Sequence, residues 1–167
     1  HLTFFGVNGN NELAGKNVES SIFFHIPCIQ YRTAWNEAKY NSETGKYDNP
    51  EYADSFGSNN EPICSPEYDS GFFALVKSLG STKNMVCGHD HVNCSSILYE
   101  GIRLSYGVKT GAGCYWEPEM SGGTTITISD DGRACIARMT VMQQFSIISL
   151  INQIILTKTY KKEIRRF

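Results

Sequence analysis

The sequence lacks a long apolar run, a strong net charge and any closely spaced pair of cysteines. Its most apolar late segment, residues 145–156, is shorter than the roughly 20 residues that a transmembrane helix needs. The formal net charge is -2, so no nucleic-acid partner is expected. Without a C-x-x-C pair, the six cysteines favour neither a zinc ribbon nor a redox site. Reduced thiols and disulfides both remain open.

The composition is that of an ordinary globular protein. Apolar residues make up 41% of the chain and charged residues 19%, which is typical of a folded, soluble domain. At 167 residues the chain has the length of one domain. It begins with His1 rather than Met, and we expect it to be a piece of a longer polypeptide. The upstream part of that polypeptide is then its first expected partner.

Three segments have a clear periodicity or an apolar run. Residues 20–27, SSIFFHIP, predict a buried strand that ends just after His25. Residues 70–80 place apolar side chains at the spacing of a short amphipathic helix. Residues 83–88 predict a second buried strand. The sequence therefore predicts strands and helices in one domain.

Other segments are read from their turn residues. Residues 95–107 and 124–141 each predict a β-hairpin. Residues 36–70 are polar and without a period, and we expect a long irregular loop there. Residues 7–12, VNGNNE, predict a turn. The segment 144–167 is apolar and then basic, and a docking helix, an interfacial helix and a non-native extension are all open for it.

Three of the four histidines follow the two predicted strands. His25 ends the first strand, and His89 and His91 follow the second. A lone histidine is usually a surface or core residue, and side chains two apart on an extended segment point to opposite faces. Gly88 would permit a turn that brings both rings into one cleft. Imidazoles at the carboxyl ends of strands predict a metal site, for which zinc, iron and manganese are suitable ions.

Two of these segments, read together, carry a family resemblance. SIFFHIP (21–27) and GHDHVN (88–93) resemble the later motifs of a calcineurin-like metallophosphoesterase, closest to the purple acid phosphatase-like branch. DSGFFALV (69–76) and GIRLSYGVKTGAGCY (101–115) also resemble that branch. The resemblance covers roughly residues 20–130. It implies an α/β (α+β) fold, a β-sandwich flanked by helices, of which residues 1–143 would form the C-terminal part, with 144–167 as a tail.

The resemblance also implies a function. It implies a phosphoric-ester hydrolase with a dinuclear centre of iron, zinc or manganese. His25 and His89 would bind one metal and His91 the other, while Asn93 would contact the phosphate-ester substrate or orient its own loop. Asp90 is expected to orient the loop rather than to bind metal.

The earlier motifs of the family have no counterpart in this sequence. The family's upstream aspartates, asparagine and histidines are missing, so no catalytic residue beyond the metal ligands is assigned. We therefore expect the isolated chain to show little or no phosphatase turnover, although its parent would be a hydrolase. The alternative is a non-catalytic binding or regulatory module that keeps the fold.

Overall fold

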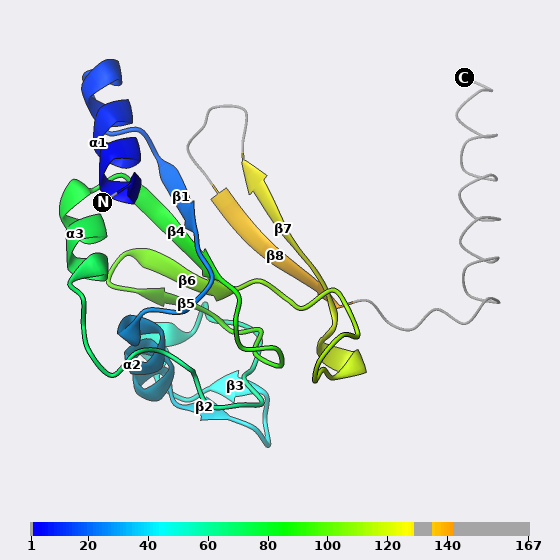
Figure 1. Ribbon diagram of the computed structural model, residues 1–167. Helices are drawn as coiled ribbons and strands as arrows, with labels where there is room; N and C mark the ends of the chain where they lie inside the picture. The colour runs from blue at the N-terminus through cyan, green and yellow to red at the C-terminus, as the bar shows by residue number, and fades with distance from the viewer. Residues whose placement is uncertain (1, 129–134, 142–167) are drawn as a thin grey trace, which may run out of the picture.

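A four-stranded mixed sheet forms the centre of the molecule (Figure 1). The computed structural model describes residues 2–128 and 135–141. The sheet has the order β1-β4-β6-β5, with strands at Ser20–Phe23, Thr82–Cys87, Ile102–Tyr106 and Ser96–Tyr99 respectively. β1, β4 and β6 run parallel, and β5 pairs antiparallel with β6. The carboxyl ends of the three parallel strands therefore meet at one edge of the sheet.

The part of the chain that the structure describes has three α-helices beside this sheet (Figure 1). They are α1 (Leu2–Ala14), α2 (Ile29–Ala38) and α3 (Phe72–Leu79). α3 contacts both α1 and β4, and α2 contacts β5. Apolar side chains of α2, α3 and the sheet form one core, whose most deeply buried members are Ala34, Ala38, Val76, Met85, Cys87, Ile97, Leu104 and Tyr106. The mixed arrangement of helices and strands confirms the predicted α/β (α+β) class.

The helix, the second strand and both hairpins were predicted from the sequence. α3 ends at Gly80, whose φ of 72° and N–H bond to the Lys77 carbonyl terminate the helix. β4 matches the strand predicted at residues 83–88, beginning one residue earlier and ending one residue earlier. The β5–β6 hairpin turns through Glu100 and Gly101, both with positive φ, as a two-residue turn that matches the strand twist requires.

The second predicted hairpin is a separate two-stranded sheet. It consists of β7 (Gly122–Ile128) and β8 (Cys135–Val141), which pair antiparallel over their whole length. The predicted turn of this hairpin lies outside the described residues. A short 3₁₀ helix, η2 (Pro118–Met120), precedes β7. The Gly122 N–H donates to the Lys109 carbonyl at 2.9 Å, which attaches the hairpin to the segment after β6.

The predicted turn at residues 7–12 is wrong, because α1 runs through this segment. Val7 is buried, and the Asn11 amide donates to the Ser81 hydroxyl at 2.5 Å. Asn11 also accepts the Val18 N–H at 2.8 Å. These contacts outweigh the low helix propensity of glycine and asparagine, which is worth less than about 1 kcal/mol per residue.

Residues 36–70 are also more ordered than expected. α2 ends within this range, and β2 (Tyr40–Asn41), β3 (Lys46–Tyr47) and the 3₁₀ helix η1 (Pro50–Tyr52) follow it. Aromatic packing orders this part: the Trp35 ring stacks on Tyr40 at 5.1 Å between centroids.

The first predicted strand, at residues 20–27, is shorter in the structure than predicted. β1 ends at Phe23, whose side chain is 63% exposed, and His25 lies beyond the strand.

The apolar and basic tail lies outside the described residues, so the division into 1–143 and 144–167 stays a prediction. Within the described part of the chain, no helix has the length and apolar character needed to cross a bilayer.

Candidate metal centre

The carboxyl edge of the parallel strands carries a cavity of about 260 Å³. His25 follows β1, the Gly88–His91 segment follows β4, and residues 107–111 follow β6. All three predicted metal ligands line this cavity. Its full lining is His25, Gly88, His89, Asp90, His91, Gly107, Val108, Lys109, Thr110 and Gly111.

His25 and His89 lie against each other although they are 64 positions apart in the chain. His89 Nδ1 and His25 Nε2 are separated by 3.3 Å, with the two rings nearly perpendicular at 88°. The Gly88 N–H donates to the His25 carbonyl at 3.1 Å and fixes the two segments together. Two imidazole nitrogens on one tetrahedral zinc ion lie about 3.4 Å apart. The nitrogen pair forms a hydrogen bond between the two rings, and its separation also matches that of two ligands on one ion.

His91 is held in a different direction. Its ring stacks on Tyr115 with centroids 4.3 Å apart, and its Nδ1 is 3.0 Å from the Tyr115 carbonyl oxygen. A carbonyl only accepts, so Nδ1 carries the proton of this bond and Nε2 keeps its lone pair. A backbone carbonyl behind the distal nitrogen is the usual support of a metal-binding histidine. The arrangement thus suits metal binding through Nε2.

The sharp backbone turn falls on His89 rather than on Gly88. His89 has a φ of 74°, in the left-handed region, whereas Gly88 is not among the glycines with positive φ. The expectation that Gly88 supplies the turn is therefore wrong. A Cβ at Gly88 would lie 3.6 Å from His25 Nδ1, which is an ordinary van der Waals contact. Non-glycine residues with positive φ occur at functional sites more often than elsewhere.

Asp90 is buried between the two histidines of the motif, with 4% of its surface exposed. Its Oδ2 accepts the Tyr106 hydroxyl at 2.6 Å, the Cys64 N–H at 3.1 Å and the Asn93 amide at 3.3 Å. Burial raises the pKa of the Tyr106 hydroxyl, which keeps it a donor to Asp90. The bonds from Tyr106 and Cys64 tie the end of β6 and the segment around Cys64 to the loop that carries the histidines, and the bond from Asn93 is made within that loop.

Asn93 is 2% exposed and its hydrogen bonds are made within the protein. Its Oδ1 accepts the Glu61 N–H at 3.1 Å, and its amide donates to Asp90. An isolated antiparallel β-bridge between Asn59 and Asn93 also joins these two segments. The predicted contact of Asn93 with substrate stays a prediction, while the structure gives this side chain a place in the loop's support.

Cys64 lies at the site and was not selected from the sequence. The ligand atoms of Cys64, His89 and Asp90 all lie within 4.8 Å of one another. Cys64 sits in the segment expected to be an irregular loop, and no spacing connects it to the GHDH motif. Only the contacts of residues 59–64 with the loop after β4 bring this thiol close to His89. Cys28, Cys64, Cys87, Cys94 and Cys114 are not in disulfides, and of these Cys64 and Cys114 are exposed.

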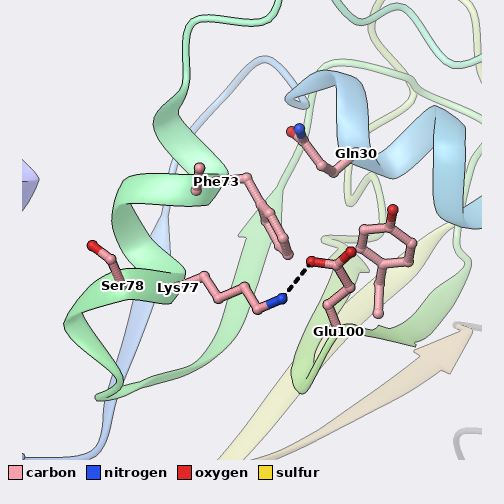
Figure 2. Close-up of a pocket in the computed structure, with 7 residues that line it drawn as sticks. Gln30, Phe73, Lys77, Ser78 and Glu100 are labelled. Carbon is pink, nitrogen blue, oxygen red and sulfur yellow. Dashed lines mark hydrogen bonds and ion pairs between the residues drawn. The ribbon is translucent and has the colours of Figure 1, made fainter.

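A second cavity lies away from the histidines, between α3, the start of α2 and the β5–β6 turn (Figure 2). It measures about 560 Å³ and its walls include Gln30, Phe73 and Tyr99. Lys77, the cation of this wall, is already paired with Glu100 at 2.7 Å. No histidine lines it, so the carboxyl edge of the sheet is the better candidate for metal chemistry.

Comparison with known proteins relates the chain to purple acid phosphatase-like metallophosphoesterases. It is 33% identical over 85 residues to probable inactive purple acid phosphatase 14 of Arabidopsis thaliana, covering 51% of this chain and 18% of that protein. It is 26% identical over 112 residues to probable inactive purple acid phosphatase 28 of the same plant, covering 67% of this chain and 24% of that protein. No family profile and no solved structure matches. The predicted relationship is thereby confirmed, and the mixed sheet with its helices is consistent with part of a calcineurin-like fold.

Proposed function

We propose, on the premise of this relationship, that the chain supplies His25, His89 and His91 to a dinuclear metal centre that hydrolyses phosphate esters. The observation that carries the proposal is the 3.3 Å separation of His89 Nδ1 and His25 Nε2, which suits two ligands of one ion. His91 is directed by Tyr115 and would serve the second ion. The ions would be iron, zinc or manganese.

The chain's own residues would hold and orient the substrate site. Two bound ions would supply Lewis acidity toward the phosphate and a water of lowered pKa. The Tyr115 carbonyl would keep the His91 proton on Nδ1, and Asp90 would hold the loop in place through its three hydrogen bonds. Lys109 lines the same cavity, and its ammonium group would balance the negative charge of a phosphate ester.

A two-metal site needs bridging carboxylates that the three histidines do not provide. The chain spans only about a fifth to a quarter of the length of the curated relatives it matches. We infer that the remaining ligands belong to upstream polypeptide and that the 167-residue chain alone has little phosphatase turnover. Metal-dependent hydrolysis of a generic aryl phosphate by the purified chain would contradict this.

The second candidate is a binding or regulatory module without catalysis. The word "inactive" in the names of both relatives favours it. The two candidates differ in whether the polypeptide containing this chain holds two metal ions, and metal analysis of that polypeptide separates them. Two ions and turnover support the hydrolase, whereas no bound metal supports the module.

The ligand roles are tested by zinc titration calorimetry on the 167-residue chain. We expect His25→Ala and His89→Ala each to weaken zinc binding about tenfold or more, because each removes a nitrogen from a two-nitrogen pair. His1→Ala is the matched control, since His1 belongs to neither motif. Equal zinc affinity in all four proteins would refute the pairing.

A further inference from the structure

The histidine cavity borders a second set of ligand atoms that the family resemblance does not assign. A sulfur, a ring nitrogen and a carboxylate oxygen, from Cys64, His89 and Asp90, lie within 4.8 Å of one another. Donors of these types on one tetrahedral zinc ion are about 3.3–3.7 Å apart. The three side chains therefore need only a small movement to close on an ion.

We propose that Cys64 is a thiolate ligand, which together with His89 and Asp90 holds one zinc-like ion within this chain. The proposal rests on the proposed function in taking His89 as a ligand. The new proposal goes beyond that function by adding a sulfur donor and by requiring no ligand from upstream polypeptide.

The backbone of Cys64 is held firmly while its side chain is exposed. The Cys64 N–H donates to Asp90 Oδ2 at 3.1 Å, and the flanking side chains of Ile63 and Ser65 are buried. The Arg32 guanidinium donates to the Ser65 carbonyl at 2.8 Å. Ordering a ligand costs conformational entropy, and here the backbone part of that cost is already met by the fold.

The described hydrogen bonds of the Asp90 carboxylate converge on one of its two oxygens. The three hydrogen bonds that the structure describes for its carboxylate all end on Oδ2. Hydrogen bonds of this kind orient a ligating carboxylate without using its second oxygen. The fixed backbone of His89 places its ring beside this carboxylate.

The mixed donor set selects the class of ion. Thiolate with imidazole favours zinc and other soft ions over magnesium and calcium, which prefer oxygen. On binding, the Cys64 thiol releases its proton to water and the sulfur binds as the thiolate. Three protein ligands leave a fourth position for water, as in open zinc sites.

Cobalt(II) titration of the 167-residue chain tests the proposal, because thiolate ligation gives cobalt a charge-transfer band in the near ultraviolet. We expect this band in the parent chain and in Cys114→Ser, which alters the other exposed described cysteine. We expect Cys64→Ser to lose the band and to bind cobalt about tenfold more weakly. Circular dichroism of Cys64→Ser checks that the fold is kept, and X-ray absorption of the zinc-loaded parent chain should show sulfur at about 2.3 Å.

A band that persists in Cys64→Ser, or zinc without sulfur in its absorption spectrum, would overturn the proposal. If the parent chain binds cobalt without showing the band, and this binding is lost in His25→Ala and His89→Ala, then Cys64 is not a ligand and the proposed function stands. If the band is lost in Cys64→Ser and in His89→Ala but kept in His25→Ala, the sulfur site stands. The pairing of His25 with His89 on one ion then fails.

Discussion

Asp90 shows at the scale of single residues how the candidate site is held. It lies between His89 and His91 in the sequence, yet its buried carboxylate faces Tyr106, Cys64 and Asn93. His89 and His91 flank it and, together with Asp90 itself, line the cavity.

We expect Asp90→Ala to lower the free energy of unfolding by about 3 kcal/mol, because the buried donors of Tyr106 and Asn93 lose their acceptor. Urea denaturation followed by fluorescence measures this. Asp69→Ala, whose hydrogen bonds are exposed, should cost less than about 1 kcal/mol. Equal losses in the two variants would show that the Asp90 network contributes little.

At the scale of elements, the three parallel strands explain why distant histidines meet. β1 and β6 both pair with β4, so the segments that follow them leave the same edge of the sheet. Apolar spacing predicted α3, an apolar run predicted β4, and turn residues predicted the β5–β6 hairpin. These local sequence patterns were sufficient to predict the three elements. α1 and α2 were not predicted, because long-range contacts rather than a clear local pattern stabilise them.

Two glycine substitutions of the same kind should have opposite effects on stability. Gly101→Ala should destabilise by about 1–2 kcal/mol, because φ at this turn is 84°. Gly9→Ala, in the middle of α1, should stabilise by up to about 1 kcal/mol. A Cβ meets nothing within 4 Å at either position, so backbone conformation alone decides the sign of the stability change. Thermal denaturation of both variants checks the signs, and a shift in the same direction for both would contradict this.

At the scale of the whole molecule, burial keeps several ionisable groups neutral. Burial raises the pKa of the Cys28 thiol from 9.0 to about 11. Burial also raises the pKa of Cys87 and Tyr106, both of which lie in the core. The folded protein therefore holds protons that the unfolded chain gives up first as the solution becomes alkaline.

We expect stability to be fully present below pH 9 and to fall between pH 9 and 11, because the unfolded chain ionises before the folded one. The loss by pH 10.5 should be at least about 1 kcal/mol. Urea denaturation at pH 7, 9 and 10.5 measures it, and Cys28→Ala should show a shallower decline. A midpoint that does not change over this range would contradict the expectation.

The sequence by itself determined the α/β class, the β4 strand, the two hairpins and the three histidines of the candidate site. These features are local: an apolar run, a turn dipeptide or a short motif carries each of them. Only the tertiary structure decided that His25 meets His89 at 3.3 Å, that His89 takes the left-handed turn, and that Cys64 lies near His89 and Asp90. The reason is physical, since sheet pairing and the buried Asp90 network bring together residues whose separation in sequence carries no signal.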